Sequence, residues 1–471
     1  MDDNAERPLS GDDVADGLYA SDGDVSQTFL AHVGAAIADR DTIVLKRDVA
    51  ELHETELADL LEALQPPQRQ ALVELLGEDF DFEALTEVDE AIRMEIVEQL
   101  PNDQIAEAVR DLDSDDAVYI LEDLDAADQE DILGKLPFAE QIRLRKALEY
   151  PEESAGRRMQ TEFVAVPPFW TVGQTIDYMR DDTDLPESFA QIYIVDPAVK
   201  LLGAVDLDRI LRTKRSERVG DIMHETRHAI PALMDQEDAA QVFEQYDLLS
   251  AAVVDDSERL VGVLTIDDIV DVIQQEAEED IMRLGGVGDE ELSDSVLETS
   301  RSRIPWLLVN LATAFITATF IGLFDTTIEK KVALAILMPI VASLGGNAGI
   351  QTMTVTVRAL STRDLDTHNA RRIIRREALV GLVNGATIAI LIGTVAALWF
   401  REPQLGMVIA VAMIGSLLMA AFAGILIPLL LDKLGADPAI SSSIFVTMIT
   451  DLTGFVGFLG LAAWWFGLGW G

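Results

Sequence analysis

The chain has 471 residues and a formal net charge of −48, yet its mean hydropathy is +0.20, so charged and apolar residues must be segregated. Residues 1–300 carry 23 basic and 74 acidic side chains, whereas residues 301–471 carry 12 and 9. Such an acidic surface repels phosphate and excludes nucleic acid as a partner. The lack of cysteine excludes disulfides and cysteine-ligated metals. Most of the acidic excess is interpreted as the solvation of a halophile's protein in molar salt.

The N-terminal half begins with residues 1–28, which are acidic and poor in apolar residues and are predicted to be disordered. They contain no basic segment followed by an apolar run, so no secretory signal peptide is expected. Residues 29–150 show short amphipathic patterns such as VAELHETELADLLEAL, punctuated by prolines roughly 35 residues apart. This pattern predicts an all-α, helical-repeat domain.

Residues 151–275 contain strand-like runs in pairs, QIYIVD with LLGAVD and later AAVVDD with LVGVLT, each followed by an acidic helical pattern. The repetition predicts tandem α/β domains over residues 151–216 and 217–275. A connecting helix is expected over residues 276–303. The carboxylates around its start either form a solvated helix surface or bind cations.

Five apolar segments follow, at residues 304–324, 332–357, 378–400, 405–431 and 439–465. Each exceeds the roughly 20 residues that a helix needs to cross a bilayer, so residues 304–471 are predicted to form a five-helix transmembrane domain. The loop 358–376 carries six arginines and should be cytoplasmic. This topology places the N-terminal 300 residues inside the cell and the C-terminus outside.

Two polar groups interrupt these apolar spans. Asp451 is the single charge in its segment, and Ser443 and Thr447 precede it at helical spacing, on one face. Asn347 and Gln351 share a face within the glycine-rich run GGNAGIQ. A carboxylate inside a bilayer must face a pore, an ion or a partner. Oxygen ligands without cysteine or histidine favour Mg2+ or Ca2+, although close helix packing through the glycines is the alternative for the second group.

The sequence resembles the MgtE family of magnesium channels along nearly its whole length. The motifs are PIVASLGGNAGIQ, VRALSTRDLD, RREALVG, LLDKLGADPA and TDLTGF in the apolar half, with VGDIMHET and GVLTIDDIVDVIQQEAEEDI before it. The resemblance implies a helical N-domain, a pair of CBS domains, a plug helix over 276–303 and a homodimer in the lipid bilayer. It also implies a pore site for hydrated Mg2+ at Asp451, with Asn347, Ser443, Thr447 and Gln351 as neighbours.

The resemblance further implies that cytosolic Mg2+ closes the pore by bridging acidic residues. The candidates are Asp115, Asp116, Asp268, Asp271, Glu276, Glu278 and Glu279. The second CBS repeat fits a nucleotide pattern at Gly262, Thr265 and Asp268, so ATP, if bound, should prefer that repeat. The first repeat departs from the pattern with Asp206 and Arg209, and Ser443 and Ile444 depart from the residues that usually line the outer pore.

We therefore expect a Mg2+-selective channel that imports Mg2+ and closes when its acidic cytosolic domains bind the ion. A transporter or exporter of another divalent cation, such as Co2+ or Mn2+, is one alternative. A non-conducting, membrane-anchored Mg2+ sensor is another, but a pure anchor has no use for Asp451. No Walker motif and no histidine cluster is present, so an enzyme is not expected.

Overall fold

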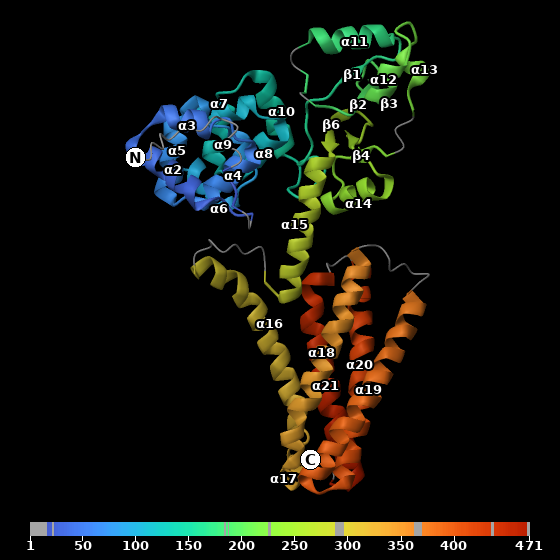
Figure 1. Cartoon of the computed structure of the whole chain (residues 1–471). Helices are drawn as coiled ribbons and strands as arrows, with labels where there is room; N and C mark the ends of the chain where they lie inside the picture. The colour runs from blue at the N-terminus through green and yellow to red at the C-terminus, as the bar shows by residue number, and fades with distance from the viewer. Residues whose placement is uncertain are drawn as a thin grey trace, which may run out of the picture. The chain divides into compact units, whose positions relative to one another are not determined.

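The structure is a computed structural model that describes residues 17–20, 23–182, 185–186, 188–224, 228–287, 296–361, 370–434 and 438–468. The chain forms two units, residues 1–274 and 275–471 (Figure 1). Of the N-terminal stretch predicted to be disordered, residues 1–16 and 21–22 lie outside the described residues. The prediction is wrong for its end, because Leu18 is fully buried and Tyr19 donates a hydrogen bond to Asp59 at 2.6 Å.

The first unit begins with a helical domain, as predicted. Prolines and acidic caps mark its boundaries: Pro66 lies at the first position of its helix, and Asp125 caps another by accepting from two backbone N–H groups. Leucine side chains form a single core. The helices are α2 (Gln27–Asp39), α3 (Thr42–Asp48), α4 (Glu54–Ala63), α5 (Pro66–Leu76), α6 (Glu90–Val97), α7 (Asn102–Asp111), α8 (Ser114–Glu122), α9 (Ala126–Leu133) and α10 (Phe138–Leu148). Two short 3-10 turns, Gly77–Asp79 and Phe82–Leu85, separate α5 from α6.

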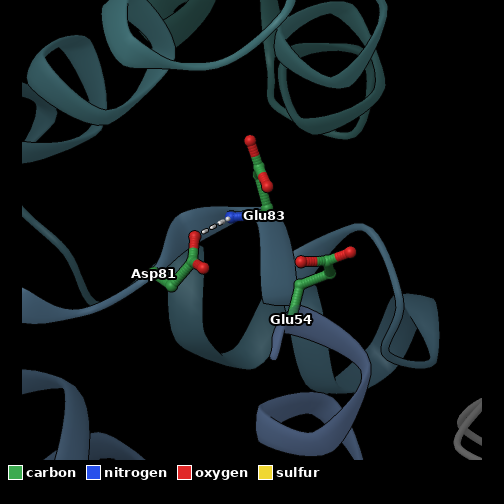
Figure 2. A group of neighbouring side chains, drawn as sticks. All are labelled: Glu54, Asp81 and Glu83. Atoms are coloured by element: carbon green, nitrogen blue, oxygen red, sulfur yellow. Dashed lines mark hydrogen bonds between the residues drawn. The ribbon is translucent and has the colours of Figure 1, made fainter. Parts of the chain in front are cut away.

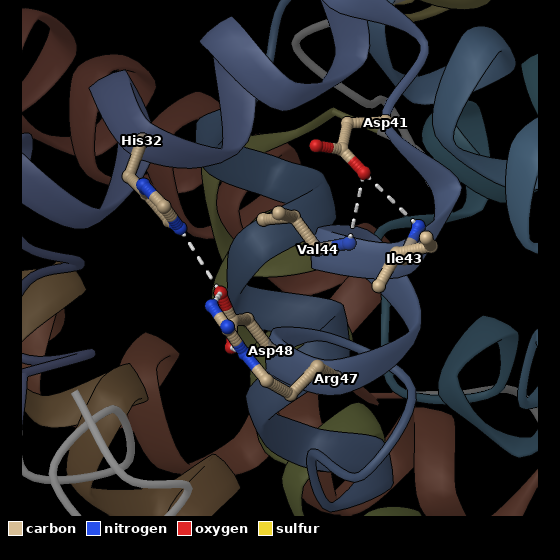
Figure 3. Close-up of polar contacts among 6 residues, drawn as sticks. All are labelled: His32, Asp41, Ile43, Val44, Arg47 and Asp48. Atoms are coloured by element: carbon tan, nitrogen blue, oxygen red, sulfur yellow. Dashed lines mark hydrogen bonds and ion pairs between the residues drawn. The ribbon is translucent and has the colours of Figure 1, made fainter. Parts of the chain in front are cut away.

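A buried carboxylate ties α2 to α3 (Figure 3). The Asp48 side chain is 1% exposed, and it accepts from Arg47 at 2.5 and 2.6 Å and contacts His32 Nε2 at 3.0 Å. The hydrogen bonds from Arg47 lower the pKa of Asp48, with a smaller contribution from His32, and together they outweigh the effect of burial. Asp41 caps α3 by accepting from the backbone of Ile43 and Val44, both at 3.2 Å.

Two small sheets with the same topology follow and confirm the internal duplication. Each sheet has three strands, in the orders β1-β2-β3 and β4-β5-β6. The first strand is parallel to the middle strand, and the middle strand forms an antiparallel hairpin with the third. The first repeat contains β1 (Ala165–Val166), α11 (Val172–Asp181), β2 (Gln191–Val195), β3 (Leu201–Asp206) and α12 (Leu207–Arg212). After α13 (Val219–Ile222), the second repeat contains β4 (Ile230–Pro231), α14 (Gln236–Tyr246), β5 (Ser250–Val254), β6 (Leu260–Thr265) and α15 (Ile266–Gly285).

The two repeats exchange their leading segments. Ala155 and Met159 precede the first sheet in the sequence but pack in the core of the second repeat, where Gln160 forms a bridge with Val263. Val219 and Ile222 precede the second sheet but belong to the core of the first repeat. The predicted division at residues 216 and 217 describes chain order, whereas each core contains residues from both sides of it.

The second unit consists mainly of long apolar helices. They are α16 (Val296–Gly322), α18 (Ala333–Ser361), α19 (Ala370–Phe400), α20 (Pro403–Lys433) and α21 (Pro438–Phe466), with the short α17 (Asp325–Lys330) after α16. Among the described residues, these five long helices contain segments apolar and long enough to cross a membrane, as predicted. Helix α20 packs against α18, α19 and α21, and their shared core includes Leu337, Leu405 and Leu459.

The predicted connecting helix over residues 276–303 is divided. Residues 276–285 are the second half of α15, which starts directly after β6, and Gly286 follows the helix with a φ of +73°. Residues 288–295 lie outside the described part of the chain, and α16 already begins at Val296. The carboxylates expected on the connecting helix therefore lie on a helix that belongs in sequence to the second repeat.

Candidate functional site

The first candidate site lies where α18 contacts α21. A Cβ atom added at Gly349 would lie 2.7 Å from Val446 Cγ1 and 3.1 Å from Thr450 Cγ2, so only glycine lets the two helices approach this closely. Gly345 likewise faces Thr450, and an added Cβ there would lie 2.7 Å from Ser416 Oγ of α20. The close helix packing considered as the alternative for the glycine-rich run is therefore present, because Gly345 and Gly349 form the surface of α18 that packs on α20 and α21.

This contact brings the predicted polar residues of two helices to one level of the bundle. Asn347 lies between the two contacting glycines in the sequence. On α21, Thr447 follows the contacted Val446 and Asp451 follows the contacted Thr450. Asp451 is half-buried, and no hydrogen bond or ion pair of its carboxylate is found among the described residues. Ser443 lies two turns before Asp451 on the same helix. Gln351 departs from this group, because it lines a cavity formed with α19 and α20.

The second candidate site gathers carboxylates from α8 and α15. Asp115 and Asp116 lie in the first turn of α8, and Asp268 lies in the first turn of α15. Burial first, and then repulsion by Asp268 and other acids, raises the pKa of Asp115 well above its usual range and that of Asp116 to about 7. Burial likewise raises the pKa of Asp268 to about 6, although this carboxylate accepts a hydrogen bond from the Thr265 hydroxyl.

Further acids surround this group, which we call the α8–α15 acid cluster: Asp115, Asp116 and Asp268. Asp113, Glu83 and Glu87 repel it from the helical domain. Asp271, predicted as a regulatory ligand, lies on α15, and its own pKa is raised by burial and by Asp267. The sequence analysis missed Asp113, Glu83 and Glu87, because they lie far from α15 in the chain and fit no motif.

Basic residues neutralise neighbouring acids but not this cluster. Arg93 pairs with Asp123 at 2.6 Å, and Arg157 lies 3.5 Å from Glu122. In the described part of the chain, no ion pair joins Asp115, Asp116 or Asp268 to a basic side chain. Paired carboxylates are accounted for structurally, whereas the unpaired cluster needs protons or cations to offset its repulsion.

The remaining predicted regulatory acids, Glu276, Glu278 and Glu279, lie on the second half of α15. Glu279 forms an ion pair with Arg283 one turn later on the same helix. This pairing partly neutralises Glu279, a feature that composition alone did not reveal.

Comparison with known proteins agrees with this organisation. Residues 338–461 match the MgtE family, described as divalent cation transporters, residues 52–153 match the MgtE intracellular N domain, and residues 219–275 match the CBS domain. The magnesium transporter MgtE of Enterococcus faecalis is 35% identical over 320 residues, which cover 68% of this chain and 71% of that protein. The magnesium transporter MgtE of Thermus thermophilus is 35% identical over 317 residues, which cover 66% of this chain and 70% of that protein.

The chain belongs to the MgtE family. It is therefore a membrane protein of a transporter family, with a cytoplasmic N-terminal domain, which agrees with the expectation that it is not an enzyme. Among solved structures, the cytosolic domain of the Mg2+ channel MgtE in complex with ATP matches 52% of this chain and 99% of its own length, at 26% identity and a TM-score of 0.48.

The MgtE N domain contains a third group of acids, Glu54, Asp81 and Glu83 (Figure 2). One carboxylate oxygen from each lies within 4.8 Å of the others, which is compatible with a shared cation. Asp81 also accepts a hydrogen bond from the backbone of Glu83 at 3.1 Å. An all-oxygen set of this kind suits Mg2+ or Ca2+. Glu54 lies in the first turn of α4, Asp81 caps the second 3-10 turn, and Glu83 lies within that turn, a combination that the sequence analysis did not find.

The nucleotide pattern in the second CBS repeat has a packing explanation for one of its residues. A Cβ atom added at Gly262 would lie 2.6 Å from Met159 Sδ and 2.8 Å from the Gln160 carbonyl oxygen. Glycine is therefore required where the exchanged segment crosses β6. Thr265 and Asp268 hydrogen-bond to each other, and Asp268 also belongs to the α8–α15 acid cluster.

Proposed function

We propose that this MgtE protein is a Mg2+-selective channel that imports Mg2+ across the cell membrane and closes when cytosolic Mg2+ binds its acidic domains. The observation that carries this proposal is the α8–α15 acid cluster, whose carboxylates are drawn together without basic partners. A transporter with no regulatory ion would gain nothing from such a costly arrangement.

The conducting part of the proposal rests on Asp451. A carboxylate in an apolar span costs at least ~2.5–3.5 kcal/mol, so its retention implies a function such as attracting cations. Mg2+ sheds its water reluctantly, so Asp451 would bind it through hydration waters. Asn347, Thr447 and Ser443 offer further oxygens for those waters, and Gln351 would act nearer the cytoplasmic side.

The gating part follows from electrostatics. Without Mg2+, Asp115 and Asp116 repel Asp268 and favour separation of α8 from α15. Bound Mg2+ offsets this repulsion and therefore selects the compact, closed state. Because a shift from mostly open to mostly closed requires about 5.5 kcal/mol, several ions must bind, and Asp271, Glu276, Glu278 and Glu279 supply additional ligands. At ~1 M salt the Debye length is only about 3 Å, so closure depends on direct ligation.

Three further features belong to the same proposal. The protein works as a homodimer in the bilayer, with its C-terminus outside the cell. ATP, where it binds, uses the second CBS repeat near Thr265 and Asp268. Since Asp268 is also a proposed Mg2+ ligand, ATP and Mg2+ should influence each other's binding.

The test is Mg2+ flux into proteoliposomes while Mg2+ on the side of the cytosolic domains is titrated. As Mg2+ on the cytosolic side rises, flux should fall at least about tenfold more than the smaller Mg2+ gradient alone would cause. The double variant Asp115→Asn, Asp116→Asn should stay conductive at high Mg2+, whereas Glu74→Gln with Glu107→Gln, two exposed acids elsewhere in the N domain, should close normally.

Other outcomes distinguish the alternatives. Flux of Co2+ or Mn2+ in place of Mg2+, or flux only in the outward direction, would identify a different transporter. A correctly inserted protein without flux, but with Mg2+-dependent compaction, would identify a sensor. Mg2+ flux that ignores cytosolic Mg2+ would refute the proposed gate and leave the acidic residues as salt adaptation.

A further inference from the structure

A cavity of about 170 Å³ lies among α18, α19 and α20, and it contains the most buried charge in the described membrane helices. Its polar lining consists of Gln351 and Thr352 from α18 and Glu377 and Asn384 from α19. Helix α21, which carries Asp451, does not contribute to the lining. The volume is well above the roughly 10–15 Å³ that one water requires, so the cavity has room for an ion with part of its hydration shell.

Glu377 is only 9% exposed, yet its charge is hardly compensated. Among the described residues, the basic group near the Glu377 carboxylate is Arg376, whose Nε lies 4.0 Å from Glu377 Oε1. The Arg376 side chain is 73% exposed. An ion pair at that distance with a solvated partner contributes little. No hydrogen bond of the Glu377 carboxylate occurs within the described ranges. The Glu377 carboxylate therefore lies beside the cavity with little compensation from a basic side chain.

The two amides of the cavity need water or an ion as well. Gln351 and Asn384 are exposed although they lie on apolar helices, and no hydrogen bond of either side chain is found in the described part of the chain. Hydrocarbon would leave these amides unsatisfied. A void left only by the packing of small residues would have no need for two amide side chains. Beside the cavity the helices do pack closely, because a Cβ atom added at Gly381 would lie 3.0 Å from the Ala421 Cβ.

The cavity lies at the cytoplasmic end of the bundle. The N-terminal domain is cytoplasmic, so α16 leads outward and α18 returns, and the segment between α18 and α19 is inside the cell. Glu377 follows the start of α19 by seven residues, a rise of about 10 Å, and Gln351 precedes the end of α18 by ten. The polar lining therefore comes from the inner halves of both helices.

We propose that this cavity is a second binding site for a hydrated divalent cation, at the inner end of the conduction path and separate from Asp451. Glu377 supplies the charge, while the oxygens of Gln351, Asn384 and Thr352 bind the water shell that Mg2+ retains. The proposal rests on the proposed function, because it assigns the same class of cargo to a further site.

The experiment uses the full chain, and the lack of native cysteine allows single labels without prior substitutions. Val380→Cys carries a nitroxide at the cavity, and Mn2+ serves as the paramagnetic probe of the site. Leu398→Cys carries the control label, 74% exposed and about 27 Å further along the same helix. Mn2+ should broaden the spectrum of the first label at much lower concentration than that of the second.

In the Val380→Cys background, Glu377→Gln should raise the Mn2+ concentration for half-maximal broadening at least about tenfold, whereas Glu377→Asp should stay close to the parent. Asp451→Asn should leave the broadening unchanged. An unchanged titration in Glu377→Gln, or loss of the broadening in Asp451→Asn, would overturn the proposal.

A control for folding keeps the result decisive. If Glu377→Gln does not elute from a sizing column and take up the label like its parent, the double variant Gln351→Leu, Asn384→Leu replaces it. This double variant should need a severalfold higher Mn2+ concentration for half-maximal broadening. A titration like that of the parent would then reject the site. Failure of the channel proposal is recognised separately: the parent protein would conduct no Mg2+ in proteoliposomes while Mn2+ broadening at residue 380 persisted.

Discussion

The buried and half-buried carboxylates of this protein fall into two groups, those that form an ion pair with a basic side chain and those with little or no such compensation. The buried Asp48 and the largely buried Asp123 each pair with a guanidinium group, which makes their charge part of the packing. Asp451, Asp115 and Glu377 are buried or half-buried with little or no such compensation among the described residues. A charge without a partner in such an environment is retained for function, since its burial alone destabilises the fold.

For Asp451 this argument gives a direct prediction. Asp451→Asn keeps the size of the side chain but removes the charge that attracts a hydrated cation, so Mg2+ flux should fall at least about a hundredfold. Asp432→Asn, at an exposed carboxylate near the end of α20, should conduct like the parent. Uptake is measured with a Mg2+ indicator in proteoliposomes at matched protein content. Normal flux in Asp451→Asn would remove this residue from the pore.

Helix α18 shows how glycines position functional residues at the scale of an element. Gly345 and Gly349 face Ser416, Val446 and Thr450 at distances that leave no room for a methyl group, whereas nothing lies within 4 Å of a Cβ atom at Gly346. Two of the three glycines in the motif are thus required for contact with α20 and α21. The close contact also sets the height of Asn347 relative to Asp451.

Gly349→Ala should therefore separate α18 from α21, lower stability by about 1–3 kcal/mol and reduce Mg2+ flux. Gly346→Ala is the matched control, and it should conduct normally and be equally stable or up to about 1 kcal/mol more stable, since alanine favours helix. Thermal unfolding in detergent and flux in proteoliposomes measure both effects. Equal behaviour of the two variants would show that the α18–α21 contact is not critical.

At the scale of the whole molecule, the cytosolic half stores electrostatic repulsion. Residues 1–300 carry most of the negative charge, and part of it is concentrated where α8 meets α15. Neutralising that charge, by cations or by protons, should stabilise the contact. The salt adaptation inferred for the remaining charge stays a prediction.

The proton effect has a defined sign. In the folded state the pKa is about 7 for Asp116 and about 6 for Asp268, whereas the ordinary value is 3.8. Between pH 3.8 and these raised values, the folded state therefore binds more protons than the unfolded state. In Mg2+-free buffer the α8–α15 contact should be most stable near pH 4 and lose that stability as the pH rises through 6 to 7. Limited proteolysis from pH 8 to pH 5 should show increasing protection, and Mg2+ should restore protection at pH 8.

The variant Asp115→Asn, Asp116→Asn separates this effect from the titration of other acids. It should show a flatter pH dependence and little response to Mg2+ at pH 8. A parent-like pH profile would mean that other carboxylates dominate the contact.

Much of the architecture was predictable because its signals are local. Span length, the charge asymmetry and the two pairs of strand-like runs each depend on neighbouring residues, and they led to five membrane helices and a duplicated α/β region. Asp451 was found for the same reason, as a single charge in an apolar run. The family resemblance added the regulatory role of the acids, which no local pattern contains.

Packing decided the rest, because it joins residues that are distant in sequence. Asp115 meets Asp268 only when α8 docks near α15, and Glu83, Glu87 and Asp113 reach the same place from loops and helix starts without a motif. The repeats exchange their leading segments because Met159 and Val219 fill cores on the other side of the predicted boundary. Glu377 gains its cavity from two neighbouring helices. Repulsion and burial act through space, so only the folded chain determines which carboxylates share an ion.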